Sequence, residues 1–339
     1  MKRNKIRIGT RGSKLAVWQA EWVKTKLKRF YPDLDIELIK IKTTGDKILD
    51  VPLAKVGGKG LFVKEIEESL LRNRVDIAVH SMKDVPTDFP DGLHLPVICK
   101  REDPRDALII SQRLKIKSIE LKPQFPASLI FSLPENARIG TSSLRRSCQL
   151  LHIRPDFRIE HLRGNLDTRL RKLDEGQYDA IILAAAGVVR LGLKQRISEV
   201  LPFEISLPAI GQGAIGIECR IEDEFINNVI LPLNHQESSA CIMAERAFLK
   251  KLEGGCQVPI AAFARIITPL NDNYTAVKNE RVESRLIVMD GFVGSITGDT
   301  IIRESINGVV ENAEKLGIQL AENIILHGAK KILDEIYGR

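Results

Sequence analysis

One short motif occurs twice in this chain, and it constrains the fold more than any other feature. Residues 7–13 (RIGTRGS) and 138–143 (RIGTSS) each pass from apolar positions through a Gly-Thr turn to a serine. Segments with the apolar spacing of a helix follow, at 14–20 and 144–150. A serine directly before such a segment is a preferred N-cap, because its hydroxyl can accept a hydrogen bond from a free helix N–H. The motif predicts the same strand, turn and helix in each half of the chain.

Two further segments match between the halves. Residues 75–80 (VDIAVH) and 178–184 (YDAIILA) are nearly continuous apolar runs. Each run follows a charged segment with helical spacing, at 61–73 and 165–175. Apolar runs of this kind are typical of strands buried in a parallel sheet. The sequence therefore predicts two α/β domains built on one plan.

Basic side chains accompany both Gly-Thr turns. Arg11 lies in the first turn, and Arg145 with Arg146 follows the second. In open α/β sheets ligands bind beyond the carboxyl ends of the strands, where helix N-termini offer free N–H groups and a positive dipole end. The alternative is that these arginines lie on solvated helix faces, but their repeated placement favours two anion sites that face one another between the domains.

The charge of the chain also indicates an acidic ligand. The net charge is +7, yet only 5% of the residues are aromatic and none lies among the arginine clusters. Proteins that bind nucleic acids commonly add aromatic stacking platforms to a basic groove, so we expect a small polyanion and no nucleic acid. The amino terminus has no apolar segment typical of a signal peptide, and no stretch is long enough to span a membrane. These features predict a cytoplasmic protein without a membrane partner.

Cysteine and histidine spacing gives no metal motif. The five cysteines form an odd set without CxxC or Cys/His spacing, so we expect reduced thiols and no metal site. His80 and His94 are interpreted as core or turn residues rather than catalysts. Cys256 follows two glycines, Gly254 and Gly255, which can end a helix and present the thiol on a loop. Such a thiol could carry a group covalently, or it could pack as a small apolar side chain.

Lys83 and Asp84 come directly after the apolar run 75–80, so they are expected at the carboxyl end of a buried strand. A carboxylate at that position could orient N–H groups, stabilise a developing cation and move protons. The alternative is that both residues only cap a turn.

A long stretch rich in glycine and lysine, residues 42–60, connects a predicted strand to a helix. Long loops of this kind in compact domains are often lids. A nucleotide-binding P-loop is excluded, because Leu53 stands where the first glycine of that motif belongs and Gly60 replaces its Ser/Thr.

The pattern changes again near residue 236. It predicts a helix that ends at Gly254, three strands at 259–267, 283–290 and 299–304, and a closing helical stretch from about 311. This order is typical of a small α+β domain.

Taken together, a series of long motifs in the same order resembles the porphobilinogen deaminase family, also called hydroxymethylbilane synthases. The resemblance covers nearly the whole chain. The motifs lie at 8–11, 55–62, 80–86, 101–107, 140–146, 162–165, 207–214 and 252–259.

The resemblance implies an α/β fold of three domains, with two doubly wound domains like those of periplasmic binding proteins and a small α+β C-terminal domain. Domain 1 would comprise 1–100 and 214–231, because the chain crosses back into it. Domain 2 would comprise 105–207, and domain 3 would comprise 236–339 and carry the cofactor cysteine. A monomer is also implied.

The same resemblance implies the chemistry. Cys256 would hold a dipyrromethane cofactor through a thioether and use it as a primer. Four porphobilinogen molecules would each lose ammonia to give an azafulvene and add to the chain, and hydrolysis would release hydroxymethylbilane for tetrapyrrole and haem biosynthesis. Asp84 would bind pyrrole N–H groups, stabilise the azafulvenium charge and assist proton transfer, and Lys55 and Lys59 would belong to a lid. The cofactor and substrate would be bound by Arg11, Ser13, Lys83, Thr141, Ser142, Ser143, Arg145, Arg146, Arg163, Arg169 and Arg190.

Two other function classes remain open on the residues alone. A non-catalytic anion receptor would explain the arginines, but not the Gly-Gly-Cys hinge or the Lys83-Asp84 pair. A thiol-dependent transferase or hydrolase would explain Cys256, but not the repeated arginine sites. The receptor predicts no covalent adduct, the hydrolase predicts one that turns over, and the deaminase predicts one that stays.

Overall fold

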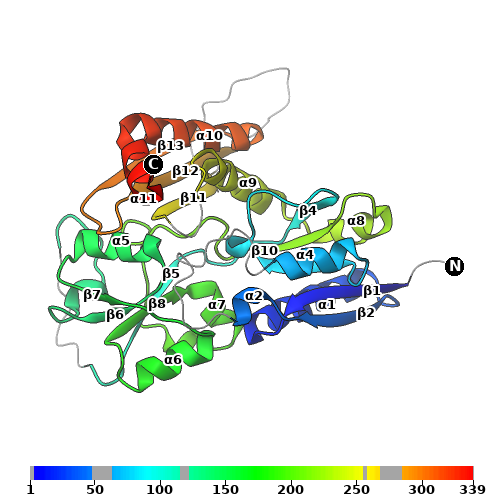
Figure 1. Cartoon of the computed structure of the whole chain (residues 1–339), viewed down its shortest axis with the longest axis horizontal. Helices are drawn as coiled ribbons and strands as arrows, with labels where there is room; N and C mark the ends of the chain where they lie inside the picture. Colours follow the sequence, from blue (N-terminus) through cyan, green and yellow to red (C-terminus); the bar gives the residue numbers. More distant parts are fainter. Residues whose placement is uncertain (1–3, 48–62, 115–121, 255–257, 268–284, 339) are drawn as a thin grey trace.

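The computed structural model describes residues 4–47, 63–114, 122–254, 258–267 and 285–338. The described chain forms three sheets (Figure 1), each associated with its own helices. The first sheet has the strand order β2-β1-β3-β10-β4. Its strands are β1 (Lys5–Arg11), β2 (Asp35–Ile41), β3 (Ile77–Ser81), β4 (Leu93–Ile98) and β10 (Ile215–Arg220), and its helices are α1 (Lys14–Phe30), α2 (Thr44–Lys47), α4 (Lys64–Leu71) and α8 (Glu224–Ile230).

The second sheet repeats this arrangement in the order β7-β6-β8-β5-β9. In both sheets the strand of the Gly-Thr motif is second in the order and pairs in parallel with its two neighbours. The predicted common plan is therefore confirmed. The strands are β5 (Asp106–Ile110), β6 (Arg138–Gly140), β7 (Arg158–Glu160), β8 (Ala180–Ala184) and β9 (Glu199–Val200), and the helices are α5 (Leu144–Ile153), α6 (Leu166–Asp174) and α7 (Ala185–Arg190).

The glycine of each motif is required by packing. A Cβ atom on Gly9 would lie 3.1 Å from Val75 Cγ2, and one on Gly140 would lie 2.9 Å from both Ile181 Cγ2 and Tyr178 Cδ1. The two positions are equivalent, because each faces a neighbour from the apolar run of the adjacent strand. At both positions a side chain would crowd the apolar side chains packed against the strand, which explains why the glycine occurs in both halves.

A three-stranded antiparallel sheet follows, and neighbouring helices pack on it around one apolar core. The predicted order of helix, three strands and closing helices is confirmed. The strands are β11 (Ile260–Ile267), β12 (Leu286–Gly294) and β13 (Ile301–Val309), and the helices are α9 (Gln236–Lys251), α10 (Ala313–Ile324) and α11 (Lys330–Tyr337). An α/β fold with two similar sheets and a smaller C-terminal α+β unit is thus observed. None of the described helices is long and apolar enough to cross a membrane.

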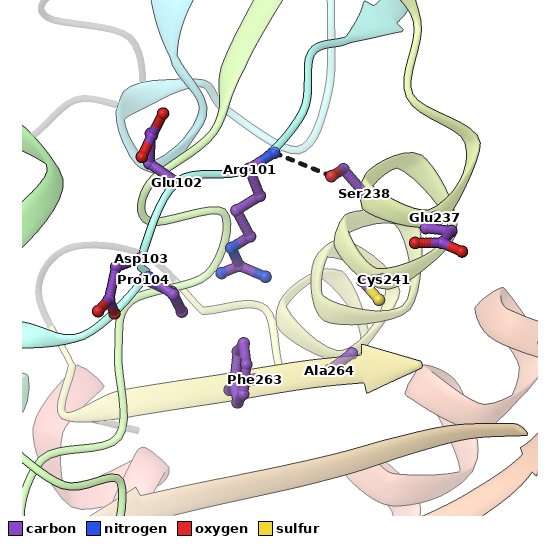
Figure 2. A pocket seen from close by; sticks show the side chains of 9 residues that line it. All are labelled: Arg101, Glu102, Asp103, Pro104, Glu237, Ser238, Cys241, Phe263 and Ala264. Atoms are coloured by element: carbon purple, nitrogen blue, oxygen red, sulfur yellow. Dashed lines mark hydrogen bonds between the residues drawn. The ribbon is translucent and has the colours of Figure 1, made fainter. Parts of the chain in front are cut away.

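The C-terminal unit contacts both larger units. Arg101, at the end of β4, pairs with the fully buried Glu245 of α9, whose other oxygen accepts a bond from Gly211 N at 2.7 Å. Figure 2 shows a pocket lined by Arg101 and Phe263. The Arg101 guanidinium lies 5.1 Å from the centre of the Phe263 ring. The pocket contains none of the predicted site residues. On the other side, the stacked rings of Phe203 and Phe263 join the C-terminal sheet to the second sheet's unit.

Candidate functional site

The two repeated turns begin their helices in different ways. Ser13 is the N-cap of α1, and its hydroxyl accepts a hydrogen bond from Ala16 N at 3.3 Å, as predicted. Ser143 stands at the N-cap of α5, but its hydroxyl makes no cap bond. Instead, Thr141 Oγ1 accepts from Ser143 N at 3.2 Å, and Ser142 donates to the carbonyl of Leu162 at 3.0 Å. The second turn is therefore held by side chains that point back into the backbone.

A cavity lies where the first motif meets the end of β3. Lys83 and Asp84 occupy the 3-10 turn Met82–Asp84 directly after β3, as the strand prediction requires. Asp84 is exposed and lines the cavity together with Arg11 and Ser13. Three of the predicted site residues are therefore brought together, and the neutral side chain of Gln19 from α1 also lines the cavity.

Charged residues of the second unit act on the same turn. Burial is the main reason that the pKa of Lys83 is lowered to about 8, and the nearby Arg146 lowers it further while Asp84 opposes the shift. Burial, Arg146 and Arg163 likewise lower the pKa of Arg169 to about 10, and Asp84 again opposes them. Predicted cations from both halves therefore lie near Asp84. This part of the structure holds more cations than carboxylates.

This crowding gives a pH-dependent expectation. The lowered pKa means that Lys83 loses its charge as the pH rises through about 8, so binding of an anionic substrate should weaken there. We expect the KM for an anionic substrate to rise several-fold between pH 7.5 and 9 in the wild type. Lys83→Arg should remain charged and abolish most of this rise, because guanidinium does not titrate in that range. A KM that rises equally in both proteins would exclude Lys83 as the cause.

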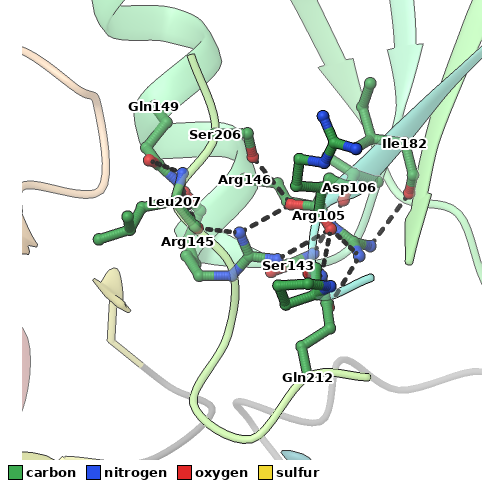
Figure 3. A network of polar contacts seen from close by, with 12 residues as sticks. Arg105, Asp106, Ser143, Arg145, Arg146, Gln149, Ile182, Ser206, Leu207 and Gln212 are labelled. Carbon is green, nitrogen blue, oxygen red and sulfur yellow. Dashed lines mark hydrogen bonds and ion pairs between the residues drawn. The ribbon is translucent and has the colours of Figure 1, made fainter. Parts of the chain in front are cut away.

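Arg145 and Arg146 differ from the expectation of free, ligand-facing cations, because both guanidinium groups are bound to one carboxylate (Figure 3). Asp106 Oδ2 lies 2.8 Å from Arg145 Nη1, and Asp106 Oδ1 lies 2.6 Å from Arg146 Nη2. All three side chains are buried. Burial alone would raise the pKa of Asp106, but the two arginines outweigh it and hold that pKa well below its usual range. The cluster thus carries two positive charges and one negative charge.

Neutral partners complete the Asp106 cluster. Ser206 donates to Asp106 Oδ2 at 2.8 Å, and Gln212 Nε2 donates to Asp106 Oδ1 at 2.9 Å. Each arginine also donates to a backbone carbonyl, of Leu207 or of Ile182. Sequence reasoning missed Asp106, although its position at the start of an apolar run resembles those of Asp76 and Asp179, which bind Arg7 and Arg138.

The remaining predicted arginines lie in two places. Arg163 and Arg169 flank the turn before α6, where Gly164 has φ of 108° and its carbonyl accepts from Arg169 Nε at 2.8 Å. Arg190 lies elsewhere: it donates to Gly213 O at 2.7 Å, faces the Trp18 ring and has its pKa lowered chiefly by burial.

Three predicted residues, Cys256, Lys55 and Lys59, lie outside the described residues. The described chain stops at Gly254 and resumes at Val258.

Fold and site together define a multidomain α/β protein in which cations of two similar units surround one carboxylate. A family model described as "Porphobilinogen deaminase, dipyromethane cofactor binding domain" matches residues 6–228, and "Porphobilinogen deaminase, C-terminal domain" matches residues 239–325. The chain therefore belongs to the porphobilinogen deaminase family, whose members are transferases of tetrapyrrole biosynthesis.

Individual relatives agree with this membership. The chain is 52% identical to the porphobilinogen deaminase of Geobacter metallireducens, over 98% of this chain and 95% of the relative. It is 51% identical to that of Geobacter sulfurreducens, over 99% and 96%. Among solved structures, an ancestral cationic amino acid solute binding protein matches 68% of this chain and 89% of its own, at 13% identity and a TM-score of 0.41. The VFT2 domain of BvgS from Bordetella pertussis matches 67% and 85%, at 14% identity and 0.38.

Proposed function

We propose that this chain condenses four porphobilinogen molecules, with loss of ammonia, on a dipyrromethane primer attached to Cys256, and then releases hydroxymethylbilane by hydrolysis. The observation that carries the residue assignment is the convergence of Lys83 and Arg169 on Asp84, with more cations than carboxylates in that part of the structure. Acetate and propionate side chains on each pyrrole would neutralise this excess. The described residues therefore fit a polyanionic cofactor and substrate.

The cations have distinct roles in this proposal. Lys83, Arg163 and Arg169 bind pyrrole carboxylates directly, because none of the three forms an ion pair with a carboxylate among the described residues, and Arg11 joins them from the wall of the Asp84 cavity. Arginine suits this task since its planar fork makes two parallel hydrogen bonds to one carboxylate. Arg145 and Arg146 contribute the net positive charge of the Asp106 cluster. Arg190, which donates to the Gly213 carbonyl, contributes a further cation for cofactor or substrate carboxylates.

Hydroxyl groups supply neutral donors. Ser13 Oγ and Thr141 Oγ1 each accept a backbone N–H, so their own hydrogens remain to be donated to a ligand oxygen. Ser143, whose hydroxyl makes no cap bond, adds a third donor at the second turn, whereas Ser142 donates to the Leu162 carbonyl and offers its oxygen as an acceptor. Bound dipyrromethane supplies the terminal pyrrole carbon to which substrate units are joined.

Asp84 performs the chemical role. Its exposed carboxylate accepts hydrogen bonds from substrate pyrrole N–H groups, so it opposes the positive charge that develops as the amine leaves. Lys55 and Lys59 are proposed to belong to the lid that covers this site.

Organisation and location complete the proposal. Domain bounds of 1–100 with 214–231, 105–207 and 236–339 are supported by the membership of β10 in the first sheet and of β5 in the second. We further propose a cytoplasmic monomer that binds no nucleic acid. The charge and the low aromatic content support the last point, and the family resemblance supports the monomer and the location.

The intact mass of the purified protein, followed by peptide mapping, tests the primer. We expect a stable added mass of two linked pyrrole units on Cys256, which Cys256→Ala removes. Cys241→Ala is the matched control, since Cys241 is a buried cysteine of the preceding helix and should leave the adduct in place. An unmodified wild type that gains no mass after incubation with porphobilinogen would contradict the proposal and favour an anion receptor.

A further inference from the structure

Behind the Asp84 cavity lies a buried acid–base cluster that the chemistry described so far does not use. His80 of β3 lines the cavity together with Asp84. Its Nε2 lies 2.8 Å from Glu218 Oε2 of the neighbouring strand β10, and both side chains are almost fully buried. Glu67 of α4, a helix that packs on both strands, is buried beside them. Two carboxyl groups and one imidazole therefore share an enclosed space.

The hydrogen bond assigns the ring nitrogens. An ionised carboxylate can only accept, so Nε2 of a neutral His80 must carry the hydrogen and Nδ1 must carry the lone pair. No described residue bonds to Nδ1. The second oxygen of Glu218, Oε1, is buried without a hydrogen-bond partner among the described residues. An unpaired buried acceptor is costly, and a positive charge on the adjacent ring would offset that cost.

Glu67 is a third titratable group that interacts with His80 and Glu218. Burial, and then the Glu218 carboxylate, raise the pKa of Glu67 to about 7, while His80 lowers it. Near neutral pH the cluster can therefore hold Glu67 protonated, because two buried carboxylates resist ionising together. The other charged groups around the ring are Arg11 of β1 and Asp84, on the cavity side, and α1 contributes only neutral Gln19 there.

We propose that His80, held by Glu218, accepts the proton that each condensation releases into the cavity it shares with Asp84. This inference rests on the proposed function. In each condensation a carbon–carbon bond forms, the aminomethyl C–N bond breaks and a pyrrole C–H bond breaks. Nitrogen leaves as ammonia, the C–H electron pair restores the aromatic ring, and the proton passes to Nδ1 of His80. The resulting imidazolium is paired with Glu218 and returns its proton to water or ammonia before the next cycle.

The test compares His80→Gln with His94→Gln in the holoenzyme. Glutamine can still donate a hydrogen bond to Glu218 but cannot take up a proton. His94 lies in the same sheet and bonds to Asn227 Oδ1 at 2.8 Å, so its replacement is the matched control. We expect His80→Gln to lower kcat by at least tenfold and leave KM within about threefold, in line with the loss of a general base. Its kcat should also lose the decline toward acidic pH that a general base with an imidazole ring imposes on the wild type, whereas His94→Gln should match the wild type within twofold.

A second measurement does not depend on turnover. In holoenzyme carrying ¹³C-labelled histidine, the NMR titration of His80 should move to lower pH in Glu218→Gln, because the glutamine removes the carboxylate that is bonded to Nε2. Glu222→Gln, at an exposed carboxylate just after β10, is the control for loss of one carboxylate and should leave the midpoint in place. This experiment stays informative if His80→Gln fails to fold.

The proposal is overturned if kcat of His80→Gln stays within twofold of the wild type across pH 6–9, if its loss is the same at every pH, or if the His80 midpoint does not move in Glu218→Gln. Failure of the proposed function would be seen separately, since a wild type without primer mass or bilane release fails before any variant is compared.

Discussion

Asp84→Ala is expected to lower turnover by about 100-fold or more, the usual range for the loss of a positioned acid–base group. Asp84 is the one carboxylate of the described site that is both exposed and surrounded by cations from two units. Its removal should leave the primer attached, because its proposed role is in the condensation step. Steady-state assays and intact mass on the same preparation measure both effects.

Asp88→Ala is the matched control for this substitution. Asp88 lies four residues further along, is exposed, and pairs with the equally exposed Lys250 at 2.7 Å. Exposed ion pairs of this kind contribute about 0–1 kcal/mol, so turnover should stay within twofold. An internal check is available too: since Asp84 raises the pKa of Lys83, the rise of KM with pH should begin at lower pH in Asp84→Ala. Unchanged turnover would remove Asp84 from the mechanism.

Asp106→Asn is expected to produce the second large effect, on stability. The substitution keeps the shape of the side chain but leaves two buried guanidinium groups without a counter-charge. Breaking a buried ion pair in this way costs about 3–5 kcal/mol of unfolding free energy. Denaturant and thermal midpoints should both fall, and primer assembly should be impaired because Arg145 and Arg146 lose their anchor.

The pH dependence of this loss can be stated with its sign. A carboxyl group whose pKa is depressed in the folded state contributes stability above its unfolded pKa and loses it only as the pH falls through the folded value. The pKa of Asp106 is held far below its usual range, so the difference between Asp106→Asn and wild type should be the same at pH 5.5 and pH 8. Asp174→Asn, which breaks the more exposed pair with Arg196, should shift the midpoints little. A small or strongly pH-dependent loss in Asp106→Asn would contradict the ion-pair interpretation.

Local patterns predicted the strand, turn and helix at both Gly-Thr motifs, because each step there depends on neighbours in the sequence. The position of Lys83 and Asp84 followed from a general property of α/β sheets, that strand ends face the ligand side. The three strands and helices of the C-terminal unit were likewise predictable from apolar periodicity, although α9 ends at Lys251 rather than at Gly254.

Partners that are distant in sequence were not predictable in this way. Arg145 and Arg146 were recognised as a basic pair, but their carboxylate is Asp106, 39 and 40 residues away. His80 was interpreted as a core or turn residue, and it is buried, yet its bond to Glu218 spans 138 residues. Only the pairing of β3 with β10 brings these two together, and no periodicity within either strand encodes that pairing.

The placement of β10 has a consequence for how the protein is made. Residues 215–220 fill the space between β3 and β4, so the first sheet is incomplete until more than two hundred residues have been synthesised. At roughly 5–20 residues per second, β3 and β4 would wait on the order of ten seconds for the strand that joins them. During that interval one edge of β3 and one edge of β4 lack their partner strand. Unpaired strand edges are prone to aggregate, so we expect chaperones to bind the nascent N-terminal segment. The strands of the second sheet all lie between residues 106 and 200, so this sheet can form while the first is still incomplete.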